Sequence, residues 1–224
     1  MIHLDNVHFR YPSGEFRLEV PQLSVAAGEK VAVIGPSGSG KTTLLNLVAG
    51  ILAPAAGRLE VDGTALTQLS ERQRRDFRAA RIGFIFQDFG LIDYLDVLDN
   101  IVHPCRISSA LKLTSEIKQK ARQLARQLGV SSRTNHHPAK LSHGEQQRVA
   151  ICRALLLGPK LILADEATGN LDPRNKALIL DALFQAVATQ QATVLAVTHD
   201  HELLDRFDRV IDFRDFLAVS PEVA

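Results

Sequence analysis

The residues of this chain with the most specific chemistry are 35 to 42, which read Gly-Pro-Ser-Gly-Ser-Gly-Lys-Thr and complete a G-x-x-x-x-G-K-[ST] motif. The glycines of such a loop let the backbone curl so that its N–H groups point at phosphate oxygens. Lys41 supplies a positive charge for the β- and γ-phosphates, and the Thr42 hydroxyl supplies a magnesium ligand. The motif therefore predicts a site for ATP or a related triphosphate with Mg²⁺.

The segments on either side of this loop favour that interpretation over a glycine-rich turn that binds nothing. The apolar run Val31–Ile34 precedes the loop, and the run Thr43–Leu52 after it is typical of a helix. A helix that begins here adds the positive end of its dipole to the phosphate site. The expected nucleotide contacts in this segment are Gly35, Pro36, Ser37, Gly38, Ser39, Gly40, Lys41, Thr42 and Thr43.

Two adjacent carboxylates follow a second apolar run. Leu161–Ala164 is interpreted as a strand, and Asp165 and Glu166 come directly after it. The carboxyl ends of parallel strands line the ligand crevice of an open α/β sheet. Beside the phosphate loop, Asp165 would complete the magnesium shell with Thr42, and Glu166 would orient or activate an attacking water. Without the loop, an ordinary acidic turn would explain the pair equally well.

A second candidate for anion binding is the segment Leu141-Ser142-His143-Gly144-Glu145. Ser142 and Glu145 have the spacing of a capping box, which predicts a well-capped helix start. The same helix start leaves other backbone N–H groups free to bind an anion. The structural and the functional interpretation are compatible.

The strands that must position these residues are of two kinds. Residues 1 to 30 alternate polar and apolar side chains between turns, as antiparallel strands with one wet face do, and residues 59 to 61 suggest a further short strand. By contrast, Val31–Ile34, Leu161–Ala164 and Val194–Val197 are continuous apolar runs. Such runs fit parallel strands that are covered by helices on both faces.

Helices are predicted from apolar spacing and from start signals. Ser70-x-x-Gln73 has the pattern of a helix start, and residues 175 to 191 carry an apolar stripe. The apolar residues Ile117, Ala121, Leu124 and Leu128 recur at helical spacing and are closed by Gly129. The basic residues on these helices are interpreted as solvated faces rather than as a nucleic-acid patch.

Composition narrows the classes of function. Lys and Arg number 26 against 25 Asp and Glu, so charge gives no case for a nucleic-acid partner. Cys105 and Cys152 lie far apart and are expected to be buried thiols rather than a disulfide. No run approaches the ~18 apolar residues of a membrane span, and the first residues lack the features of a signal peptide. A cytoplasmic subunit that reaches a membrane through partners is expected.

Three motifs occur in a typical order along the chain: the phosphate loop, the run at 141 to 147, and the strand end at Asp165-Glu166. In this order they resemble the nucleotide-binding subunit of an ATP-binding cassette (ABC) transporter. The resemblance covers essentially the whole chain. The resemblance implies an α/β fold: a P-loop NTPase core with an N-terminal antiparallel β-subdomain and an inserted α-helical subdomain. Within this single domain, 1–224, the β-rich region is expected at about 1–30 and 57–65, and the helical subdomain at about 88–158.

The resemblance also implies roles for residues outside the three motifs. Tyr11 resembles the aromatic residue that stacks on adenine, and Gln87 resembles the loop glutamine that senses magnesium and the transmembrane partner. His199 resembles the switch histidine that contacts the γ-phosphate, although by itself it would be interpreted as structural. Asn170, Leu171 and Asp172 resemble the loop that joins two protomers. The implied catalytic residues are Glu166, His199 and Gln87, and the implied magnesium contacts are Thr42, Gln87 and Asp165.

The family arrangement implies two kinds of partner. A second copy of the chain would sandwich two ATP molecules, with Ser142, His143, Gly144 and Glu145 of one protomer completing the site of the other. Integral membrane permease subunits would take up the motion at the inner face of the cell membrane, with a periplasmic adaptor as an optional further partner. Residues 166 to 172, with Gln87-Asp88-Phe89, resemble the subgroup of macrolide exporters and lipoprotein-releasing systems, which implies export or extraction.

Two positions depart from the family pattern. Position 143 is His where Gly is usual, so its side chain would crowd the γ-phosphate contact or donate to it; position 145 is Glu where Gln is commonest.

Two alternatives to transport remain. The ATPase could drive a membrane partner that controls an extracytoplasmic enzyme, or it could act on ribosomes or DNA. The second is disfavoured because the chain has neither a second phosphate loop nor sustained heptads.

Overall fold

The computed structural model of the chain describes residues 1–14, 16–108, 111–167 and 173–216, with residues 173–175 as backbone only. Its strands are β1 (Ile2–Arg10), β2 (Arg17–Val25), β3 (Lys30–Ile34), β4 (Ala56–Val61), β5 (Thr64–Ala65), β6 (Ile82–Ile85), β7 (Leu161–Asp165), β8 (Thr193–Val197) and β9 (Arg209–Asp212). Its α-helices are α1 (Lys41–Val48), α2 (Glu71–Arg81), α3 (Val97–Val102), α4 (Pro104–Ile107), α5 (Ser115–Gln127), α6 (His143–Leu155) and α7 (Pro173–Gln190).

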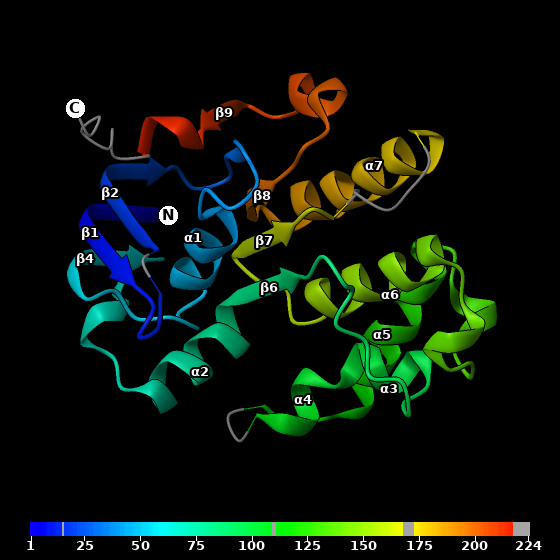
Figure 1. The fold of residues 1–224 in the computed structure, drawn as a ribbon. Helices are drawn as coiled ribbons and strands as arrows, with labels where there is room; N and C mark the ends of the chain where they lie inside the picture. Colours follow the sequence, from blue (N-terminus) through cyan, green and yellow to red (C-terminus); the bar gives the residue numbers. More distant parts are fainter. Residues whose placement is uncertain (15, 109–110, 168–172, 217–224) are drawn as a thin grey trace, which may run out of the picture.

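The strands form two sheets. The order β2-β1-β4-β5 makes an antiparallel sheet, and the order β6-β7-β8-β3-β9 makes a parallel sheet. In Figure 1 the antiparallel sheet lies beside α1, and α3 to α6 form a lobe beyond the edge strand β6. The predicted α/β architecture is confirmed, because continuous apolar runs became the buried parallel strands and alternating runs became the antiparallel ones.

The parallel sheet divides the hydrophobic core into two parts. Along β7, Leu161 and Leu163 pack into the core on the side of α1 and the antiparallel sheet, whereas Ile162 and Ala164 pack into the core formed with α3, α5, α6 and α7. Because successive side chains of a strand point to opposite faces, one strand serves both cores. The sheet is thereby held between two packed layers, and its carboxyl ends are placed rigidly.

Local sequence signals account for several helix ends. Ser70 and Ser142 both form complete capping boxes, with Gln73 and Glu145 respectively, and Gly129 adopts a left-handed φ of 72° at the end of α5. Cys105 and Cys152 are buried free thiols, as expected.

Several boundaries and elements differ from those predicted. The helix after the phosphate loop ends at Val48 rather than 52, where Gly50 with a φ of 65° terminates it. Strand β4 begins at Ala56 rather than 59. Strands β6 and β9 have four residues each and carry too short a pattern to be recognised.

The interpretation of α2 as a solvated basic face was incomplete. Arg74 donates to the carbonyl of Leu69 at 2.8 Å, and Arg78 donates to the carbonyl of Ala49 at 3.2 Å. Burial lowers the pKa of Arg78, and the neighbouring arginines Arg75 and Arg74 lower it further. Arg78 therefore joins α2 to the end of α1, and Arg74 binds the turn that precedes α2.

Gly83 of β6 permits the close contact between this strand and α6. A Cβ atom at this position would lie 2.4 Å from the carbonyl oxygen of Ala154 and 2.7 Å from Cδ1 of Ile162. We expect Gly83→Ala to lower the free energy of unfolding by about 1 to 3 kcal/mol, measured by urea denaturation, because the backbone of α6 must move. Adding Ile162→Val should recover little, since the backbone contact remains. An unchanged midpoint for Gly83→Ala would contradict this account.

Candidate nucleotide-binding and catalytic site

The phosphate loop joins the carboxyl end of β3 to the start of α1. Gly35 and Gly40 have φ angles of 149° and 105°, which disfavour any residue with a side chain. A Cβ atom at Gly35 would lie 2.9 Å from Cβ of Phe213, and one at Gly40 would lie 2.7 Å from Cζ of Phe16. The loop therefore lies against two aromatic residues that sequence analysis did not associate with it, because both contacts are long-range.

Lys41 lies across the inside of this loop. The residue is only 6% exposed, and Nζ donates to the carbonyls of Gly35 at 2.9 Å and Pro36 at 2.7 Å. Burial lowers the pKa of Lys41, and the nearby carboxylates of Glu166 and Asp165 oppose that shift. The ammonium group is thus desolvated and held by carbonyl oxygens, in a position where phosphate oxygens could replace them.

Asp165 ends β7 beside the loop and is almost fully buried. Burial raises its pKa, and a hydrogen bond from the Thr42 side chain is the largest opposing effect. Its Oδ1 atom is buried without a hydrogen-bond partner within the described residues. A buried carboxylate oxygen beside a threonine hydroxyl fits Mg²⁺, which prefers oxygen ligands.

The described residues contain no cluster of three or more His, Cys, Asp or Glu side chains that could hold a metal ion by themselves. In phosphate-transfer sites Mg²⁺ is held by one or two protein oxygens together with phosphate oxygens and water. Thr42 and Asp165 are therefore the residues that would hold the ion, together with the nucleotide.

Glu166 is held between Gln87 and His199. Nε2 of Gln87 donates to Oε2 of Glu166 at 3.0 Å, and Nε2 of His199 lies 2.5 Å from Oε1. The backbone of Glu166 has a left-handed φ of 48°, and its N–H donates to the carbonyl of Val197 at 3.0 Å. Gln87 and His199, which follow the ends of β6 and β8, thereby meet at the carboxylate of Glu166, which follows β7 and is able to accept a proton from water.

Tyr11 lies beside the loop through its hydroxyl group, which is 3.1 Å from Oγ1 of Thr43. Its ring packs edge-on against Phe9 and tilted against Phe16, with centroid separations of 4.8 and 5.9 Å. The residue is 36% exposed, which leaves room for a base to approach the ring. Stacking on adenine remains a prediction.

Ser142, His143, Gly144 and Glu145 begin α6, in the lobe of α3 to α6 (Figure 1). Glu145 closes the capping box and also accepts from Arg133 at 2.8 Å; Arg133 first, and then Ser142, lower its pKa. Within the described residues no hydrogen bond or ion pair joins this helix start to the phosphate loop. The structure thus brings together the other predicted site residues but not these. Asn170, Leu171 and Asp172 lie outside the described residues.

The fold and site geometry are those of a P-loop ATPase. The family profile described as ABC transporter matches residues 18–169, so the chain belongs to the ABC transporter family. It is similar to the lipoprotein-releasing system ATP-binding proteins LolD of Nitrobacter hamburgensis, at 38% identity over 96% of this chain and 93% of the relative, and of Maricaulis maris, at 40% identity over 96% and 94%.

Solved structures give the same result. The dimeric, post-hydrolysis ATP-binding cassette MJ0796 bound to ADP and Pi is similar with a TM-score of 0.85 and 34% identity, over 95% of this chain and 94% of that one. The chain is therefore an ATP-binding and ATP-hydrolysing subunit of a transporter-type complex. No helix within the described residues is long and apolar enough to cross a membrane.

We expect Glu166→Gln to bind ATP normally and to hydrolyse it roughly 10²- to 10⁴-fold more slowly, the usual contribution of a general base. The amide keeps the shape of the side chain but cannot accept a proton. Steady-state phosphate release measures the rate, and calorimetric titration with a non-hydrolysable ATP analogue measures the affinity. Glu202→Gln, an exposed carboxylate, is the control. Wild-type turnover in Glu166→Gln would show that another group activates the water.

A pH-dependent stability effect is expected at Asp165. The pKa of Asp165 in the folded protein is raised above its ordinary value of 3.8, so the folded state binds more protons than the unfolded state between pH 3.8 and that raised pKa. The free energy of unfolding therefore falls as the pH rises through this range. In metal-free buffer, Asp165→Asn should therefore raise the free energy of unfolding at pH 7, and the gain should shrink toward pH 4. Urea denaturation at several pH values measures both effects. A pH-independent loss of stability would contradict burial of the charge.

Proposed function

We propose that this subunit powers the release of lipoproteins, or of a similarly lipid-anchored cargo, through separate membrane subunits at the cytoplasmic face of the membrane. The observation that carries the proposal is identity of 38% and 40% to lipoprotein-releasing ATP-binding proteins over 96% of the chain. A periplasmic adaptor that receives the cargo is a further proposed partner. An exporter or a signalling complex would use the same ATPase, so reconstitution with the membrane subunits is the experiment that identifies the substrate.

The proposed hydrolysis uses the chain's own groups in defined roles. Backbone N–H groups of the phosphate loop and Lys41 bind and orient the phosphates, and the ring of Tyr11 stacks on the base. Glu166 accepts the proton of the attacking water. His199, whose Nε2 contacts Glu166 in this structure, is proposed to donate toward the γ-phosphate when ATP is bound. Gln87 fixes the Glu166 carboxylate. When bound through Thr42 and Asp165, Mg²⁺ neutralises charge on the phosphates. Positioning and charge neutralisation are the main requirements of phosphoryl transfer.

We also propose that a second copy of the chain completes each site with Ser142, His143, Gly144 and Glu145. Support comes from the solved cassette MJ0796, which is dimeric, and from the position of these residues on an exposed helix start away from the loop of their own chain. Residues 170 to 172 are proposed to join the two protomers. ATP then forms part of the interface, so binding closes the dimer and hydrolysis reopens it.

Mixing two inactive variants tests this arrangement. In a heterodimer of Lys41→Ala and Ser142→Arg chains, one composite site carries both defects and the other carries neither. If half of the mixed population is heterodimer and the sites act independently, activity should return to about a quarter of the wild-type value. In parallel, cysteines replacing Ser37 and Ser142, with Cys105 and Cys152 removed, should crosslink between chains in ATP-bound Glu166→Gln. Crosslinks within single chains only would contradict the sandwich.

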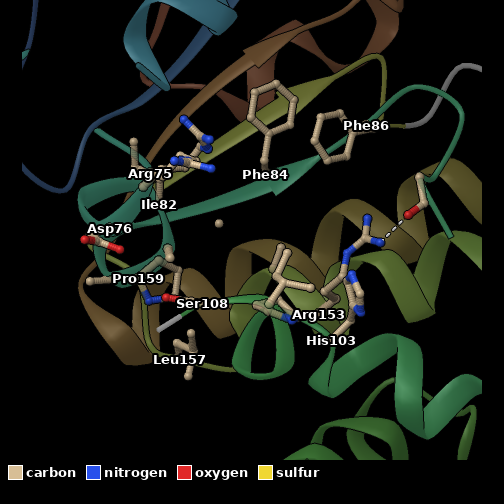
Figure 2. Close-up of a pocket in the computed structure, with 18 of the residues that line it drawn as sticks. Arg75, Asp76, Ile82, Phe84, Phe86, His103, Ser108, Arg153, Leu157 and Pro159 are labelled. Atoms are coloured by element: carbon tan, nitrogen blue, oxygen red, sulfur yellow. Dashed lines mark hydrogen bonds between the residues drawn. The ribbon is translucent and has the colours of Figure 1, made fainter. Parts of the chain in front are cut away.

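The membrane subunits are proposed to dock in a groove of about 680 Å³ between β6 and α2 on one side and the helical lobe, which we assign to about 88–158, on the other. Figure 2 shows Phe84 and Phe86 on one wall, and His103, Arg153 and Leu157 on the other. Arg72 and Arg75 add positive charge, diluted by Asp76. This lining fits a segment with an apolar face and an acidic side chain.

Arg75→Glu should weaken assembly with the membrane subunits because it places a like charge opposite the acidic partner, while ATP hydrolysis by the isolated subunit stays unchanged. Co-purification with the membrane protein of the neighbouring reading frame, and ATP-driven release of lipoprotein from vesicles containing both, measure the effect. Arg122→Glu, on the exposed side of α5, is the matched control. Equal co-purification of both variants would place the docking surface elsewhere. ATP-dependent control of a bound enzyme without release would favour signalling.

A further inference from the structure

Arg153 of α6 lines the groove, but its strongest contacts reach the loop that follows Gln87. Nη2 donates to the carbonyl of Phe89 at 2.6 Å, and Nη1 donates to the carbonyl of Gly90. The guanidinium group also lies over the ring of Phe86, 5.9 Å from its centroid. Arg153 therefore contacts residues on both sides of Gln87 and Asp88.

The loop has a conformation that depends on such a contact. Phe89 and Gly90 both have left-handed backbone, with φ angles of 63° and 54°, and the Phe89 N–H donates to the carbonyl of Phe86 at 3.1 Å. A bulky residue rarely adopts this conformation, so surrounding contacts must hold it. The planar fork of a guanidinium group can bind two carbonyls at once. Burial lowers the pKa of Arg153 to about 10, opposed by Asp88, so the fork stays charged at neutral pH.

Helix α6 holds the same loop at a second point. The side chain of Phe89 is buried, and its ring lies 5.9 Å from the ring of His143, centroid to centroid. His143 is the first residue of α6, and Arg153 follows ten residues later, about 15 Å along the helix axis. Phe89 therefore contacts two residues of α6, His143 through its ring and Arg153 through its carbonyl oxygen.

We propose that Arg153 is a positioning residue for ATP hydrolysis: it fixes the loop at Phe89 and Gly90, and so keeps Gln87 in contact with Glu166 of the same chain. This inference rests on the proposed roles of Gln87 and Glu166. It connects the carboxylate that acts on one nucleotide to the helix whose start, at Ser142, is proposed to meet the other nucleotide.

The test separates catalysis from nucleotide binding. Arg153→Met removes both donors, and Arg153→Lys keeps the charge but not the fork. We expect kcat to fall about tenfold in Arg153→Met and by an intermediate factor in Arg153→Lys. Calorimetric affinity for ATP and Mg²⁺, measured with Glu166→Gln added to prevent hydrolysis, should stay within about twofold of the Glu166→Gln parent. Arg148→Met, on the same helix but next to Gly129, is the control and should keep wild-type kcat.

The outcomes distinguish this inference from the proposed function. Wild-type kcat in both Arg153 variants, or equal losses of kcat and affinity, would overturn the positioning role. If Arg153→Met does not fold, Arg153→Lys decides: lowered kcat with unchanged affinity supports the role, and unchanged kcat rejects it. By contrast, full turnover in Glu166→Gln alone would reject the proposed catalytic carboxylate, whatever the Arg153 variants show.

Discussion

The burial of Lys41 and Asp165 close enough to interact electrostatically is the constraint on which the rest of the site depends. Each group loses hydration, which lowers the pKa of the ammonium and raises that of the carboxylate, and each is favoured in its charged form by the other. Loop carbonyls and the Thr42 hydroxyl supply the remaining polar contacts. A desolvated pair of this kind can be maintained only if the surrounding backbone does not move.

The surrounding backbone is kept in place by packing on both sides of the parallel sheet. The phosphate loop is closed by Phe16 and Phe213, and the strand that ends in Asp165 is covered by two separate cores. The lobe of α3 to α6 is joined to the sheet through α6, which packs against β6 and against the even-numbered side chains of β7. Gln87 follows the edge strand β6, between the sheet and this lobe.

The fold and much of the site could be predicted because their signals are local. The phosphate loop, the strand ending in Asp165 and Glu166, and the capping box at Ser142 each occupy a few consecutive residues, and the apolar patterns around them separate parallel from antiparallel strands. Strands β6 and β9 were not predicted because a run of four residues is too short to show a reliable hydrophobic periodicity. The contacts of Phe213 with Gly35, and of Arg153 with Phe89, join residues far apart in the chain. No local pattern could reveal them.

Strand β7 combines two requirements in one run of five residues. Its odd-numbered side chains fill the core beside α1, its even-numbered ones fill the core beside α6, and the run ends with Asp165 buried and Glu166 turned outward. Deleting a single residue from this strand would send the side chains that follow the deletion to the opposite core and bring Glu166 to the place of Asp165. Packing in the two cores therefore opposes insertions and deletions within β7. The same packing keeps Asp165 and Glu166 at their respective positions at the end of the strand.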